Sequence, residues 1–221
     1  MTVLIGFSCP AFTILGADGR SIAHDDTSDV DDETQKIYKT GVGVIAGAGR
    51  TDIIHAVTTR LEHDAPASNQ EASEIIRAEV EKLGLDPNDP GLERTCWLAS
   101  YATNTGEGPQ TMLALANRDA NYAFDPFQHN TVVVIRPAGM PEDVGRRFMI
   151  DAQAELDQRT GKAATEAHVP LCIQLIAALV RAISRLNDTV GPRWSVGVHL
   201  ARNNATAVSD VGDDPHAMAW H

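Results

Sequence analysis

The sequence predicts an α+β fold with four layers, an αββα sandwich in which two antiparallel sheets pack face to face between two pairs of helices. The expected elements follow the order strands, two helices, strands, two helices, strands. Blocks of this kind favour separate layers over βαβ crossovers. The chain has 221 residues, which suits a single domain over 1–221 with a sizeable core. Its hydrophobic residues, 43% of the chain, are enough to fill that core.

The first block is expected to form two hairpins. Its strands are rich in apolar β-formers and fall at residues 2–8, 11–17, 35–39 and 41–47. Pro10 fits the turn of the first hairpin, because proline has no N–H to give to a strand ladder. Thr40-Gly41 provides the turn of the second hairpin.

Beyond Arg50 the apolar residues recur at helical spacing, which predicts two helices. The first begins near Thr51 and ends before Pro66. The second runs from about Ser68 to Leu83, and Ser68 and Glu71 have the spacing of a capping box.

The second half of the chain repeats the alternation. Strands are expected at 95–103, 111–117, 122–124, 131–135 and 194–200, and helices at about 141–159 and 166–186. A turn follows at Asn203-Asn204, and residues from about 210 to 221 are expected to form a mobile acidic tail.

The charge of the chain excludes some partners. The net charge is −12, and part of it lies in an acidic run from Asp25 to Glu33 that is expected to be a solvated loop. Binding to nucleic acid or to an anionic membrane needs clustered Lys and Arg, so neither partner is expected. The longest apolar stretch, 169–183, is shorter than the roughly 20 residues that cross a bilayer, so no membrane span is expected.

Three cysteines, Cys9, Cys96 and Cys172, are widely spaced and form no CxxC pair. We expect them to be reduced within apolar elements, which indicates a cytoplasmic protein. No cofactor and no metal are expected. The acidic and histidine residues at 24–26 and 213–216 fall in predicted loops and are interpreted as solvated.

The first strand begins with a threonine, and this position suggests a chemistry. If Met1 is removed, Thr2 carries a free α-amine beside its hydroxyl. The hydroxyl is a weak nucleophile until a base takes its proton, and the α-amine can be that base. The reference pKa of such an amine is roughly 8, and a neighbouring cation that lowers it leaves more free base at neutral pH.

The same block of sequence contains the other parts that this chemistry needs. We assign Lys36 as the cation and Asp18 as the carboxylate that orients it. The backbone N–H of Gly47 is assigned to the oxyanion hole, because a glycine lets the backbone approach the substrate closely.

Residues 2–62 resemble a proteasome β-type subunit or the bacterial HslV peptidase, on the order Thr2, Asp18, Lys36, Gly47. The resemblance implies the same roles for these four residues. It also implies that Ile45 shapes the primary specificity pocket, that Ser21 contacts the substrate strand, and that Asp188 supplies a second carboxylate. It further implies a threonine-type peptidase that cleaves peptides or unfolded chains inside a homo-oligomeric ring, and it allows an ATP-dependent unfoldase as a partner.

Two positions depart from the family pattern. Ala138 and Val190 stand where the family has serines whose hydroxyls surround the threonine amine. Two alternatives therefore stay open. The chain could be an inactive ring or scaffold subunit of the same fold, or a small-molecule amidase with the same nucleophile.

Overall fold

The computed structural model describes residues 2–22, 30–31, 34–86, 89–161 and 163–212. The strands form two five-stranded sheets in which every pairing is antiparallel. The first sheet has the order β10 (Thr131–Ile135), β1 (Leu4–Ser8), β2 (Phe12–Asp18), β11 (Trp194–Leu200), β12 (Ala205–Gly212). The second has the order β5 (Ile37–Lys39), β6 (Val44–Ala48), β7 (Cys96–Thr105), β8 (Gly108–Asn117), β9 (Asp125–Pro126). A separate small pair joins β3 (Ser21–Ile22) and β4 (Val30–Asp31).

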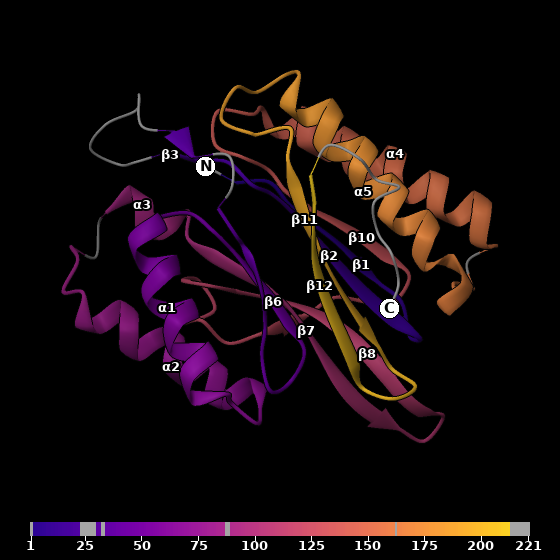
Figure 1. Ribbon diagram of the computed structural model, residues 1–221, viewed down its shortest axis with the longest axis horizontal. Coiled ribbons are helices and arrows are strands. Elements are labelled where there is room, and N and C mark those ends of the chain that lie inside the picture. The colour runs from indigo at the N-terminus through magenta and orange to yellow at the C-terminus, as the bar shows by residue number, and fades with distance from the viewer. Residues whose placement is uncertain (1, 23–29, 32–33, 87–88, 162, 213–221) are drawn as a thin grey trace.

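Helices cover both outer faces of the paired sheets (Figure 1). The helices on the second sheet are α1 (Thr51–Asp64) and α2 (Asn69–Lys82), and those on the first are α4 (Glu142–Thr160) and α5 (Val169–Ser184). A short helix, α3 (Pro90–Glu93), precedes β7, and a 3₁₀ turn, η1 (Glu166–His168), precedes α5. The predicted αββα sandwich is therefore confirmed.

Three apolar clusters fill the spaces between the four layers. Ile14 of β2 packs with α5, whereas the next residue, Leu15, lies in the cluster between the sheets. Trp97 of β7 belongs to the third cluster, with the buried residues of α1 and α2. A strand covered on both faces has no exposed side to keep polar, which explains why β2 is an almost uninterrupted apolar run.

The apolar character of α5 comes from its place in the core. The stretch Glu166–Ser184 is long and apolar enough to cross a membrane by length and composition alone. In the fold, however, Ile176 and Val180 of α5 are fully buried in the cluster beneath the first sheet. We attribute its hydropathy to this packing.

Two sequence-based expectations are wrong in detail. Residues 122–124 are not a strand, because Asn121 and Tyr122 have φ values of 48° and 58° and the chain turns there. The strand at this edge is β9, two residues long. Residues 210–212 are not part of a tail, because they complete β12, a strand that the sequence analysis missed. The remainder of the expected tail lies outside the described residues, as do both histidine-containing loops and most of the acidic run.

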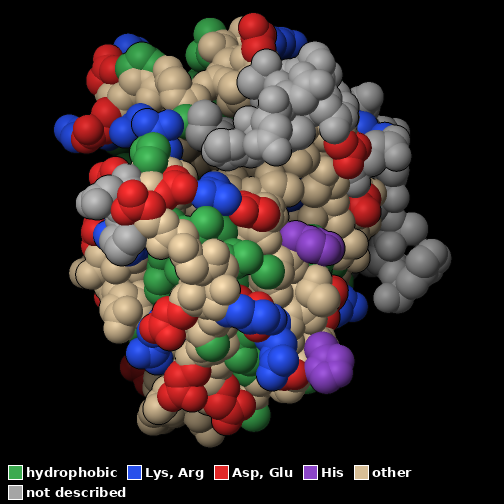
Figure 2. Space-filling view, turned by 90° about the vertical axis from the view of Figure 1, so that its left-hand side faces the viewer, with side chains coloured by type: hydrophobic (Ala, Val, Ile, Leu, Met, Phe, Trp, Pro, Cys, Tyr) green, Lys and Arg blue, Asp and Glu red, His purple; other side chains and the backbone are tan. Residues whose placement is uncertain are grey.

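Figure 2 shows the side of the molecule that carries α1 and α2. Basic and acidic side chains are interspersed over this face, and hydrophobic side chains gather near its middle. Positive and negative charges are therefore mixed on this face.

Candidate active site

Thr2, Lys36 and Asp18 meet at one end of the two sheets. The Lys36 ammonium group donates a hydrogen bond to Thr2 Oγ1 at 2.6 Å and lies 3.5 Å from Asp18 Oδ2. It also donates to the backbone carbonyl of Arg20. All three residues are buried, with Thr2 6%, Lys36 5% and Asp18 0% exposed.

The strand register brings these residues together. Leu4 of β1 pairs with Ala17 of β2, so the chain before β1 lies beside the residue that ends β2, Asp18. The N–H of Val3 donates to Asp18 Oδ1 at 2.8 Å, which fixes the backbone next to Thr2. Lys36 directly precedes β5 and enters from the facing sheet.

Three backbone N–H groups and one ammonium group hold the Asp18 carboxylate. It accepts hydrogen bonds from the N–H groups of Val3, Arg20 at 3.1 Å and Gly191 at 3.2 Å, and it forms an ion pair with Lys36. Burial raises the pKa of this carboxyl group, while Lys36 and the three backbone N–H donors act against that rise. Donors on both oxygens favour the ionised form. Asp18 can therefore orient Lys36 from a fixed position.

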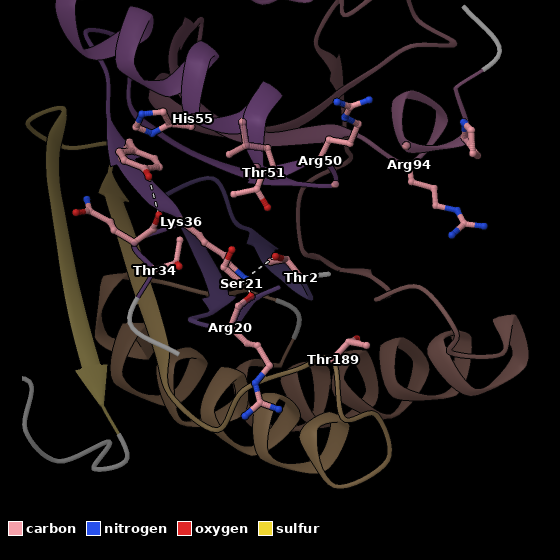
Figure 3. A pocket seen from close by; sticks show the side chains of 17 residues that line it. Thr2, Arg20, Ser21, Thr34, Lys36, Arg50, Thr51, His55, Arg94 and Thr189 are labelled. Carbon is pink, nitrogen blue, oxygen red and sulfur yellow. Dashed lines mark hydrogen bonds between the residues drawn. The ribbon is translucent and has the colours of Figure 1, made fainter. Parts of the chain in front are cut away.

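Thr2 opens onto two cavities, and Figure 3 shows the side chains that line the one under α1. The cavity under α1, of about 490 Å³, is lined by Thr2, Ser21, Lys36 and Gly47, among others. We call it the helix-side cavity. The other, of about 520 Å³, lies between the second sheet and the start of α4, and we call it the loop-side cavity. Thr2, Gly49 and Arg94 line both of them.

Ser21 and Gly47 thus lie where the sequence analysis expected them, at the cavity of Thr2. Ile45 does not. It is 2% exposed and packs in the core between the second sheet and α1 and α2. Ile45 and Gly47 share a face of β6, and it is the later residue that reaches the cavity. A Cβ atom at Gly47 would lie 2.9 Å from Ile54 Cγ2, so the absent side chain provides space there.

The loop after α5 approaches Asp18 through its backbone. The Asp188 side chain is exposed, and its carbonyl oxygen accepts a hydrogen bond from Arg20 Nη1 at 2.6 Å. The neighbour Thr189 lines the helix-side cavity, and Gly191 donates to Asp18. The expected carboxylate of Asp188 is therefore not among the residues that line either cavity.

Both positions that depart from the family pattern lie close to the site. Ala138 lines the loop-side cavity, and its carbonyl accepts from Asn187 Nδ2 at 3.2 Å. Val190 is 1% exposed and belongs to the core cluster with α4 and α5. Neither residue can supply a hydroxyl to the threonine amine.

Sequence reasoning missed Gly49 and Arg94. Gly49 has φ +123°, a conformation that side chains rarely allow, at the turn between β6 and α1. The only signal was the small-residue run Gly47-Ala48-Gly49. Arg94 follows α3 in a segment that looks like a loop by composition, and no spacing linked it to Thr2.

A second polar cluster, far along β7 and β11, contains a serine, a histidine and an asparagine. Ser100 Oγ lies 3.0 Å from His199 Nδ1, and His199 Nε2 lies 2.7 Å from Asn204 Oδ1. Ser100 and His199 are both 0% exposed, and Ser100 Oγ accepts the N–H of Val44. Because the hydroxyl of this buried serine is already hydrogen-bonded to Val44 and His199, we interpret the cluster as a structural link between the two sheets.

We expect this cluster to make folding stability sensitive to acid. Desolvation lowers the pKa of His199 in the native state. In the unfolded chain the imidazole is protonated below about pH 6.5, whereas in the native state it stays neutral to a lower pH. Stability should therefore fall as the pH drops below that value, by at most about 1.4 kcal/mol per pH unit from this residue. Urea unfolding at pH 7.5 and 5.5 measures the effect. The drop should shrink in His199→Gln but not in His63→Gln, which changes an exposed side chain.

The three cysteines are free and buried. Burial raises the pKa of each of the Cys9, Cys96 and Cys172 thiols to about 12. Because the thiolate is the nucleophilic form, none of them competes with Thr2 as a nucleophile at neutral pH.

Comparison with known proteins identifies the fold. No protein-family model matches the sequence, and no curated protein matches it either. Among solved structures, the Gly-1 mutant of Anbu from Hyphomicrobium sp. strain MC1 matches with a TM-score of 0.65 and 13% identity, over 98% of this chain and 91% of that one. A further structure of Anbu from the same strain matches with a TM-score of 0.63 and 11% identity, over 96% and 88% of the two chains. The fold is therefore a proteasome-like sandwich.

Proposed function

We propose that this chain is a threonine-type peptidase, an N-terminal nucleophile hydrolase that becomes active when Met1 is removed. The observation that carries the proposal is the contact between Lys36 Nζ and Thr2 Oγ1, 2.6 Å long, at the point where two cavities meet. A lysine paired with a buried carboxylate is costly to hold inside a protein. Its position against a threonine hydroxyl fits a catalytic use.

In the proposed reaction, Thr2 Oγ1 attacks the carbonyl carbon of a peptide bond. The hydroxyl proton passes to the α-amine of Thr2, and Lys36 stabilises the negative charge that develops on the oxygen. The backbone N–H of Gly47 binds the oxyanion of the tetrahedral intermediate, with Gly49 beside it in the same cavity. The amine proton then goes to the leaving nitrogen, and water hydrolyses the remaining ester to free Thr2.

The two cavities suit an extended substrate. Residues before the scissile bond could occupy one cavity and residues after it the other, since Thr2 lines both. We also propose that the chain associates with itself, as the proteasome-like fold suggests. An enclosed assembly would restrict the site to unfolded chains, whereas a small open oligomer would suit the amidase alternative.

Ala138 and Val190 support a second candidate, a non-catalytic subunit that keeps the fold for assembly. Both lack the hydroxyl expected around the threonine amine. Without these hydroxyls the transfer of the proton from Thr2 to its own amine has fewer hydrogen-bonding groups to guide it. This candidate predicts that Thr2 is unreactive.

Intact mass spectrometry separates the two candidates. We expect the purified protein to lack Met1 and to gain one equivalent of a threonine-directed epoxyketone. Thr2→Ala should gain none, and Thr2→Ser should keep some reactivity because it retains a hydroxyl. Retention of Met1, or a processed Thr2 that never reacts, would reject the peptidase and favour the non-catalytic subunit.

A further inference from the structure

The lining of the two cavities is basic although the chain as a whole is acidic. The sequence has 18 Lys and Arg residues against 30 Asp and Glu residues. Basic residues that line one or both cavities are Arg20, Lys36, Arg50, Arg94, Arg136 and Arg146. Among the described residues, Glu93 in the loop-side cavity is the only carboxylate in either lining. This balance favours an anionic group on the substrate.

Most of these cations already have a partner. Arg50 pairs with Asp52 and with Asp89, the latter at 2.6 Å. Arg146 pairs with Glu142 at 2.8 Å, and Arg136 Nη1 donates to a backbone carbonyl. Their guanidinium groups are therefore already engaged by other parts of the protein, and they are poorer candidates for binding a substrate.

Arg94 differs from the others. Its side chain is exposed, and it forms no hydrogen bond or ion pair within the part of the chain that the structure describes. It lines both cavities, as Thr2 does. In Figure 3 its side chain extends from the backbone that follows α3, with the guanidinium group on the side away from Lys36 in this view.

The backbone that carries Arg94 is nevertheless fixed. Asp89 caps α3 by accepting the N–H of Gly91 at 2.7 Å, and the same carboxylate binds Arg50. Thr95, next to Arg94, accepts the N–H of Arg50 at 3.1 Å and donates to the Gly91 carbonyl at 2.7 Å. These bonds tie α3 to the turn that holds Gly49. A free guanidinium group on an anchored backbone is suited to binding a ligand.

We propose that Arg94 is a specificity-determining residue that binds a substrate carboxylate next to the scissile peptide bond. Guanidinium and carboxylate groups form paired hydrogen bonds of matched geometry, so the ligand class is a carboxylate. The carboxylate belongs either to a Glu or Asp side chain beside the bond or to the free C-terminus of a short peptide. The inference rests on the peptidase proposed above and names its substrate class.

Matched peptide pairs test the inference. Each pair differs in one charge: Glu or Gln before the scissile bond, Glu or Gln after it, and a C-terminal acid or amide. We expect kcat/KM of the processed protein to favour the carboxylate about tenfold in at least one pair. The pair that shows the preference identifies the source of the carboxylate. Absence of preference in all three pairs would overturn the inference.

The variants make the test specific to Arg94. Arg94→Ala should abolish the preference, so that the two peptides of each pair have the same kcat/KM, and Arg94→Lys should retain part of the preference. Arg202→Ala, which removes an exposed arginine from the turn between β11 and β12, should keep the preference. A preference that survives in Arg94→Ala would also overturn the inference.

Binding to Thr2→Ala separates this inference from the proposed activity, because that variant cannot turn over. We expect labelled carboxylate peptides to bind it more tightly than their neutral partners, by fluorescence anisotropy, and Arg94→Ala to remove the difference. Selective binding without hydrolysis by the processed protein would keep the role of Arg94 and reject the peptidase. Hydrolysis of all pairs without selectivity would keep the peptidase and reject the role of Arg94.

Discussion

Replacing Lys36 with methionine is expected to lower kcat/KM for peptide hydrolysis by at least about a hundredfold, the usual effect of removing a group that stabilises charge in the transition state. The variant removes the donor that contacts Thr2 Oγ1 at 2.6 Å. The rate of epoxyketone addition to Thr2 should fall with it. Both rates are measured on processed protein, with loss of Met1 checked by intact mass.

The same substitution also leaves Asp18 buried without its cation. Breaking a buried ion pair on one side typically costs about 3–5 kcal/mol, so loss of activity alone could reflect partial unfolding. Lys36→Met combined with Asp18→Asn removes the unpaired charge. We expect the double variant to recover most of the urea stability and none of the activity.

The outcome of the double variant decides the role of Lys36. Recovery of hydrolysis together with stability would mean that Lys36 only supports the structure around Thr2. Continued inactivity in a stable protein would mean that the ammonium group takes part in the reaction.

The arrangement of Thr2, Asp18 and Lys36 was predictable from their chemistry and from the resemblance in order and spacing, and strand register explains how the fold produces it. A tight turn at Cys9-Pro10 fixes the register of β1 and β2, and that register places Asp18 beside the start of β1. The second hairpin then leads Lys36 into the same end of the sandwich. The layers were equally predictable, because the order of strands and helices leaves few ways to bury all the apolar faces.

The remaining parts of the site depend on tertiary detail that no local pattern encodes. Strand periodicity places Ile45 and Gly47 on one face, but only the packing of α1 decides that Gly47 lines the cavity and Ile45 the core. Asp188 lies in a loop, and a shift of one residue along a loop decides whether a side chain or a backbone group meets its neighbour. Here the backbone carbonyl of Asp188, and not its carboxylate, contacts Arg20. Arg94 lines the same cavities as Thr2 because α3 is tied to the turn at Gly49.

Replacing Gly49 with alanine is expected to cause a large loss of stability. A residue with a side chain at φ +123° is strained by about 1–3 kcal/mol. The added Cβ would also lie 2.5 Å from Thr95 Cα, a backbone atom that cannot rotate away. The combined loss in free energy of unfolding should exceed about 3 kcal/mol, measured by urea titration.

Gly84→Ala provides the matched control. Gly84 also has a positive φ, +58°, but a Cβ atom there would meet nothing within 4 Å. The free energy of unfolding of Gly84→Ala should therefore fall only by the conformational cost of roughly 1–2 kcal/mol. The difference between the two variants reports the clash with Thr95, whose hydroxyl joins Arg50 to Gly91, together with the greater strain at φ +123°.

The activity of Gly49→Ala shows whether this turn matters to the chemistry. At a temperature where the variant stays folded, displacement of Thr95 should move the Arg94 backbone and the N–H groups that face Thr2. We therefore expect both lower kcat/KM and weaker discrimination between the Glu and Gln peptides. Stability and activity equal to those of Gly84→Ala would mean that the turn adapts to the side chain, and that α3 does not hold the site in place.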